Sequence, residues 1–246
     1  MLIRAILFDK DGTLFDFQRS WAPWVAGMID RLSAGDAALA GALAEAWGFD
    51  RARKRIRAGS IIVAGDVPQV AAAALPLLAP MRKAALIALL EETAAGVAAV
   101  EQLPLAGLLD RLARSGVRCG VATNDSEKVA RAQLARAGVA GRFDFIAGHD
   151  SGFGSKPGPG MCLAFAARLG LTPESIAMVG DSPHDMRAGR AAGMRTVAVL
   201  SGPAGAEVLA PHADAVLPDI GSLPDWLSGQ AGLPGAAAPA GGGAPG

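Results

Sequence analysis

The sequence lacks three features that would each point to a class of function. It has no excess of charge, because 23 lysines and arginines balance 23 aspartates and glutamates. This balance removes the simplest argument for nucleic-acid binding. It has no apolar run long enough to span a membrane. No signal peptide is expected, because the N-terminus leads straight into a short apolar run that contains Arg4 and no small-residue cleavage site.

Cysteine is also scarce. Cys119 and Cys162 are far apart and lack the spacing of metal ligands. Such cysteines behave as small apolar residues in a reducing compartment. Together these absences predict a cytoplasmic protein that binds neither nucleic acid nor a membrane. An apolar fraction of 51% over 246 residues is enough for a sizeable core.

The most informative stretch lies near the N-terminus. The apolar run at residues 2–8 is short and aliphatic and is followed by a turn at Gly12, which predicts a buried strand. Asp9 and Asp11 follow the run two positions apart, so an extended backbone would point both carboxylates to one side. Carboxylates at the C-terminal end of a buried strand lie where open parallel sheets bind ligands.

Residues 101–228 alternate between strand-like and helix-like segments. This alternation predicts an α/β fold with right-handed crossovers and a parallel sheet. The strand at residues 2–8 belongs to the same sheet, because it needs neighbours to bury both of its faces. Further strands are expected at residues 117–122, 143–147, 175–179, 196–199 and 213–217, and helices at 105–114, 126–137, 159–169, 183–192, 205–209 and 220–227.

The segment between the first strand and this alternation has helical periodicity and no convincing strand pair. Helices are expected at residues 18–32, 36–57, 67–78 and 81–97. The run Ile61-Ile62-Val63 is expected to be a loop, because glycines bracket it closely. Residues 16–100 are therefore expected to form an all-helical insert. Residues 229–246, rich in Gly, Ala and Pro and free of charge, predict a disordered tail.

Polar residues follow the predicted strands and meet at one edge of the sheet. Crowded carboxylates repel one another unless a cation lies among them, and such oxygen ligands favour Mg²⁺. A lysine and a hydroxyl suit a phosphoryl oxygen. The residues concerned are Asp9, Asp11, Thr123, Asn124, Lys156, Asp181 and Asp185.

The chain resembles the haloacid dehalogenase superfamily of phosphatases. The motifs, in family order, are Asp9-Lys10-Asp11-Gly12-Thr13, the hydroxyl of Thr123, Lys156 before Pro157, and Gly180-Asp181 with Asp185. The resemblance implies a Rossmann-like parallel sheet core at residues 1–15 and 101–228. It also implies a helical cap at residues 16–100, inserted after the first strand as in the phosphoglycolate phosphatase and β-phosphoglucomutase branch. Phe17 departs from the pattern, since many relatives carry a small polar residue after the position of Asp16.

By this resemblance Asp9 is the nucleophile that forms an aspartyl-phosphate. Asp11 would protonate the leaving alkoxide and then take a proton from the attacking water. Mg²⁺ would be bound by Asp9, Asp181 and the main-chain carbonyl of Asp11.

The resemblance also assigns the groups that bind the substrate's phosphate. Thr123, Asn124 and Lys156 would bind its oxygens, and Thr123 and Lys156 would also be catalytic, since transition-state charge spreads over those oxygens. Asp185 would support the site by orienting Lys156 or a metal-bound water. His184 could equally belong to a solvated loop.

The implied activity is hydrolysis of a small phosphorylated metabolite such as phosphoglycolate. One alternative is a phosphomutase of the β-phosphoglucomutase type, which uses the same residues. Another is a non-catalytic phosphate-binding module, which would need only an aspartate that can be phosphorylated. A homodimer through the apolar cap is also left open.

Substrate selection is expected in the insert, because the core motifs contact only phosphate. The basic residues between Arg51 and Arg57 favour a solvated helix face. Alternatively, one of them reaches the active site and binds a charged substrate. If all are solvated, the loop at residues 60–66 is the next candidate. Trp21 and Trp24 are expected in the cap core and not as a stacking platform.

Overall fold

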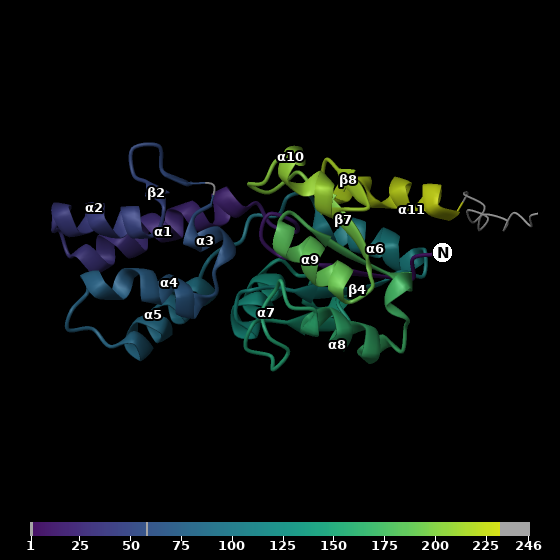
Figure 1. Cartoon of the computed structure of the whole chain (residues 1–246), viewed down its shortest axis with the longest axis horizontal. Helices are drawn as coiled ribbons and strands as arrows, with labels where there is room; N and C mark the ends of the chain where they lie inside the picture. The colour runs from purple at the N-terminus through teal and green to yellow at the C-terminus, as the bar shows by residue number, and fades with distance from the viewer. Residues whose placement is uncertain (1, 58, 232–246) are drawn as a thin grey trace, which may run out of the picture.

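The computed structural model describes residues 2–57 and 59–231, and within these ranges six strands form one parallel sheet (Figure 1). Their order is β5-β4-β1-β6-β7-β8, so the first strand of the chain is central. This arrangement confirms the predicted α/β fold with a parallel sheet core. The strands are β1 Ala5–Phe8, β4 Arg118–Ala122, β5 Phe145–Ala147, β6 Ile176–Gly180, β7 Arg195–Val199 and β8 Ala215–Leu217.

Strand β1 is apolar throughout because it is buried on both faces. Its side chains alternate between two apolar layers. Ile6 and Phe8 pack on the side of α6 and α7, whereas Ala5 and Leu7 pack on the side of α8 and α9. The helices around the sheet are α6 Leu105–Arg114, α7 Glu127–Arg136, α8 Gly160–Leu169, α9 Pro183–Ala191, α10 Ala206–Leu209 and α11 Leu223–Ala231.

Residues 17–97 supply nearly all of a second apolar core, at the left of Figure 1. Trp47 is completely buried there, and its indole N–H donates to the carbonyl of Val70 at 3.0 Å. On this ground we propose that residues 1–15 and 101–228 form the core domain and residues 16–100 the cap. The cap helices are α1 Phe17–Ser33, α2 Ala37–Ala46, α3 Ile61–Ala64, α4 Val67–Ala74 and α5 Lys83–Ala95.

The expectation of an all-helical insert was wrong at one place. Helix α2 ends at Ala46 and does not continue to Arg57, because Gly48 adopts a left-handed conformation with φ +63°. A short antiparallel hairpin follows, with β2 Phe49–Asp50 and β3 Arg55–Ile56. Ile56 is buried, and the side chain of Gln18 hydrogen-bonds both its N–H and its carbonyl. The basic run therefore lies on a hairpin and not on a helix face.

The structure also differs from expectation at residues 61–63 and at the end of the last helix. Ile61-Ile62-Val63 is the start of helix α3 and not a loop, because the Ser60 hydroxyl accepts a hydrogen bond from the N–H of Ile62 at 3.0 Å. Helix α11 continues to Ala231, past the expected start of the tail at residue 229. The rest of that predicted tail, 232–246, lies outside the described residues. None of the helices in the described ranges is both long and apolar enough to cross a membrane.

Candidate active site

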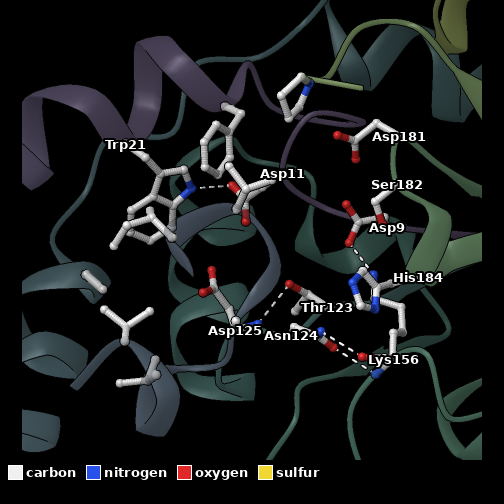
Figure 2. A pocket seen from close by; sticks show the side chains of 18 of the residues that line it. Asp9, Asp11, Trp21, Thr123, Asn124, Asp125, Lys156, Asp181, Ser182 and His184 are labelled. Atoms are coloured by element: carbon white, nitrogen blue, oxygen red, sulfur yellow. Dashed lines mark hydrogen bonds and ion pairs between the residues drawn. The ribbon is translucent and has the colours of Figure 1, made fainter. Parts of the chain in front are cut away.

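The central strands bring the predicted polar residues together at their C-terminal ends. Phe8 of β1 lies in register with Val121 of β4 and Val179 of β6. Asp9 directly follows β1, while Thr123 follows β4 and Asp181 follows β6. All three line one pocket, and Figure 2 shows them around a common space.

Lys156 comes from the loop between β5 and α8 and lies among these strand ends. Its buried ammonium ion pairs with the carboxylate of Asp9 and with that of Asp185, the latter at 2.7 Å, and donates to the carbonyl of Ala122 at 2.8 Å. Asn124 holds the Lys156 backbone: its amide group donates to the Lys156 carbonyl at 3.0 Å and accepts from the Lys156 N–H at 2.9 Å. Asn124 thus lies at the predicted site and orients the lysine.

Three buried carboxylates are close enough to bind one metal ion. One oxygen from each of Asp9, Asp181 and Asp185 lies within 4.8 Å of the other two. Burial, opposed by Lys156, raises the pKa of Asp9 to about 7. Burial, reinforced by repulsion from Asp9 and Asp185, holds the pKa of Asp181 well above its ordinary value. The two carboxyls resist ionisation here, so the donor set is suited to a hard divalent cation.

Asp181 is enclosed by the turn that follows β1. The Thr13 hydroxyl donates to its carboxylate at 3.3 Å. Gly12 has φ +83°, and a Cβ atom there would lie 2.3 Å from the Asp181 carboxylate. Only glycine can occupy this position without displacing the acid.

A second buried lysine, Lys10, contacts a different pair of carboxylates. The ammonium of Lys10, which is completely buried, contacts the carboxylates of Asp11 at 2.5 Å and Asp125 at 2.8 Å, and donates to Gln133 at 2.5 Å. Burial alone would lower the pKa of Lys10, but Asp11 and Asp125 outweigh it and raise the pKa to about 12. Lys10 therefore stays charged and compensates two acids that Lys156 does not contact.

The carboxylate of Asp11 is turned toward the cap. It accepts a hydrogen bond from the indole N–H of Trp21 at 2.6 Å (Figure 2). The ammonium of Lys10 lies 5.3 Å from the centre of the Trp21 ring. Burial raises the pKa of Asp11 although Lys10 opposes the rise. A residue of cap helix α1 thus orients one of the two predicted catalytic carboxylates.

The remaining predicted side chains are also at the pocket. The Thr123 hydroxyl is buried and accepts a hydrogen bond from the Asp125 N–H at 3.1 Å. Asp185 accepts hydrogen bonds from the N–H and the hydroxyl of Ser182, at 3.0 and 2.8 Å, at the start of α9. His184, for which a solvated loop was an open alternative, lines the pocket.

The cap closes the other side of the pocket with apolar residues. They come from α1, α3, α4 and α5 and include Phe17, Trp21, Trp24, Ile62, Val63 and Leu90. Trp21 belongs to the cap core as expected, and it lines the pocket as well. The basic residues at 51–57 do not line the pocket; Arg53 and Arg57 are paired with Asp50 and Glu45 on the surface.

Sequence reasoning missed Lys10, Gln133 and the contact between Trp21 and Asp11. A signal for Lys10 existed, because a lysine two residues after a buried apolar strand needs a specific acidic partner. The sequence carried no signal for Gln133 beyond its place on an expected helix. The segment at residues 60–66, the second candidate for substrate selection, contributes Ile62, Val63 and Gly65 to the pocket lining.

The chain is similar to several known proteins. A family model for haloacid dehalogenase-like hydrolases matches residues 3–193. The phosphoglycolate phosphatase of Xylella fastidiosa is 34% identical over 203 residues, which cover 81% of each chain. That of Rhodospirillum rubrum is 39% identical over 120 residues, about half of each chain. The structure of CbbY from Rhodobacter sphaeroides in complex with phosphate superposes with a TM-score of 0.69 at 25% identity, covering 90% of this chain and 96% of that one.

The replacement Lys10→Met tests the second lysine. Without the ammonium, the carboxylates of Asp11 and Asp125 stay buried and uncompensated, so the free energy of unfolding should fall by about 3–5 kcal/mol. The control is Lys128→Met on the exposed face of α7, which should change it by less than about 0.5 kcal/mol. Urea denaturation gives both values, and equal effects would contradict the compensating role of Lys10.

Proposed function

The chain belongs to the haloacid dehalogenase-like hydrolases as a phosphatase of that family, and we propose that it hydrolyses small phosphate monoesters with Mg²⁺ through an aspartyl-phosphate. The observation that carries the proposal is the buried cluster of Asp9, Asp181 and Asp185 around the ammonium of Lys156. A cluster of this composition can bind a cation and a phosphate together.

In the proposed mechanism a carboxylate oxygen of Asp9 attacks phosphorus while the bond from phosphorus to the substrate's alkoxide breaks. Lys156 and the Thr123 hydroxyl bind the phosphoryl oxygens, on which negative charge spreads in the transition state. Asp185 and Asn124 act on Lys156, the first through its ammonium and the second through its backbone. They are positioning residues in this proposal.

Asp11 is the proton donor in the first step of the proposed mechanism and the proton acceptor in the second. Its raised pKa favours the protonated form that gives a proton to the leaving alkoxide. Water then attacks phosphorus, Asp11 takes the proton of that water, and the bond between phosphorus and Asp9 breaks to release phosphate. Lys10 and Trp21 hold the Asp11 carboxylate in place.

The carboxylate cluster fits Mg²⁺, which prefers a few carboxylate oxygens and retains several waters. We propose that Asp9, Asp181 and the main-chain carbonyl of Asp11 bind it, with Asp185 beside them. Bound there, the ion offsets the negative charge of carboxylate and phosphate as they approach each other.

The substrate proposed from the relatives is a small phosphorylated metabolite, and phosphoglycolate is the one named for two of them. We further propose a cytoplasmic setting, supported by Cys119 and Cys162, which are both free and buried. A homodimer stays a prediction.

Replacing the nucleophile is the first test of this function. Asp9→Asn preserves shape but removes the attacking oxygen anion, so kcat should fall by at least about 10⁴-fold. Circular dichroism should show an unchanged fold. Hydrolysis of p-nitrophenyl phosphate near the wild-type rate by the folded variant would refute the assignment.

The second test separates acid catalysis from other roles of Asp11. An alkoxide needs a proton to leave and a nitrophenolate does not, so Asp11→Asn should lower kcat about 10²- to 10⁴-fold on an alkyl phosphate and far less on p-nitrophenyl phosphate. Steady-state kinetics on both esters decides the matter, and equal losses would show that Asp11 acts in another way.

The third test concerns the metal and pH. Folding raises the pKa of Asp9 from 3.8 to about 7, so between these values the unfolded chain binds fewer protons and the metal-free protein loses stability as pH rises. Binding of Mg²⁺ requires ionised carboxylates. Mg²⁺ should therefore raise the Tm more at pH 8 than at pH 6, and Asp181→Ala should remove most of the increment. Equal increments at both pH values would contradict the site.

A further inference from the structure

The pocket has two chemically different halves. The core half carries the carboxylates and Lys156, whereas every cap residue that lines the pocket in the described ranges is apolar. The proposed mechanism places the phosphate at the core half, beside Lys156. The substrate's alcohol portion must then face the cap half.

The cap half offers no free hydrogen-bond donor from its indoles. The Trp21 N–H donates to Asp11 at 2.6 Å, and the Trp24 N–H donates to the Thr93 hydroxyl at 3.1 Å. The N–H groups of Ile62 and Val63 are used within the same segment, since both donate to Ser60 at 3.0 Å. A carboxylate placed against these groups would lose part of its hydration without gaining a hydrogen bond from any of them.

The charged side chains that line the pocket also disfavour a carboxylate on the substrate's alcohol portion. Among the described residues that line the pocket, the ionisable side chains are five aspartates, Lys156 and His184, and all of them belong to the core half. Lys156 is already engaged by Asp9 and Asp185 and faces the proposed phosphate position. The arginines that could have bound a second anionic group lie on the β2–β3 hairpin, where Arg51, Arg53 and Arg57 pair with surface acids.

The shape of the cap half suits an apolar body, and an aromatic one in particular. Trp21 and Trp24 meet edge to face, with ring centroids 5.3 Å apart and planes at 85°. Such a corner presents aromatic faces and edges to a further ring.

We propose that the natural substrate is a phosphate monoester whose alcohol portion is uncharged and largely apolar, and that a carboxylated ester such as phosphoglycolate is a poor substrate. This inference rests on the proposed phosphatase function and narrows its substrate class. Specificity then lies in the apolar wall formed by α1, α3, α4 and α5.

The test compares phosphate monoesters of primary alcohols that differ in the group attached to the CH₂–O carbon. Benzyl phosphate and isobutyl phosphate are uncharged in the alcohol portion, and isobutyl phosphate closely matches phosphoglycolate in shape. With Mg²⁺ present, kcat/KM should be at least about tenfold higher for benzyl phosphate than for phosphoglycolate, with isobutyl phosphate between them. A kcat/KM for phosphoglycolate equal to or above that for isobutyl phosphate would overturn the inference.

Binding is measured apart from turnover with the corresponding phosphonates. 2-Phenylethylphosphonate should bind at least about tenfold more tightly than 3-phosphonopropanoate by calorimetry with Mg²⁺ present. If no ester is hydrolysed, p-nitrophenyl phosphate included, the proposed phosphatase function fails, and the ratio of these two Kd values still decides the substrate class. Equal binding of the two phosphonates, or tighter binding of 3-phosphonopropanoate, would overturn the proposed preference for an apolar alcohol portion.

Two variants at one position separate charge from bulk. Val63→Lys places a cation in the cap half and should move the ratio of kcat/KM toward phosphoglycolate by about tenfold or more. Val63→Met adds similar length without charge and should leave phosphoglycolate poor. Arg53→Ala, on the hairpin outside the pocket, should leave the ratio unchanged. A loss of phosphoglycolate activity in Arg53→Ala would place the selecting charge on the hairpin and refute the proposal.

Discussion

The site depends on cations that make a crowd of buried carboxylates tolerable. Asp9, Asp181 and Asp185 lie within 4.8 Å of one another around Lys156, while Asp11 and Asp125 share Lys10. In a medium of low dielectric constant, buried carboxylates without a nearby cation would take up protons. Lys156 compensates the negative charge at the proposed phosphate site, and Lys10 compensates that of Asp11, the proposed proton donor.

The cap and the core are joined through this charge arrangement. The indole of Trp21 belongs to the cap core, yet its N–H donates to Asp11 and its ring lies near Lys10. The orientation of Asp11 therefore depends on where the cap lies. In the proposed mechanism the proton carrier would be placed correctly only when the apolar wall also contacts the substrate, so substrate selection and proton transfer would be linked in one helix.

Much of the fold was predictable because its signals are local. Alternating strands and helices, turn residues and apolar periodicity defined the sheet, and four short motifs placed Asp9, Thr123, Lys156 and Asp181 at its edge. The hairpin was missed because its strands have two residues each, too few for any period, although Gly48 marked the end of α2. The contacts of Lys10 with Gln133 and of Trp21 with Asp11 were not predictable, because each joins side chains whose meeting depends on tertiary packing.

The central place of β1 has a consequence for synthesis of the chain. Both of its partners are made later, β4 after the whole cap and β6 at residues 176–180. At ordinary rates of ribosomal translation, the time between synthesis of β1 and synthesis of β6 is on the order of 10 to 30 seconds. Meanwhile the cap, continuous in sequence and with its own apolar core, can fold beside a bare strand. A growing chain therefore cannot complete the sheet around β1 until residue 180 has been made, whereas every helix of the cap is available much earlier.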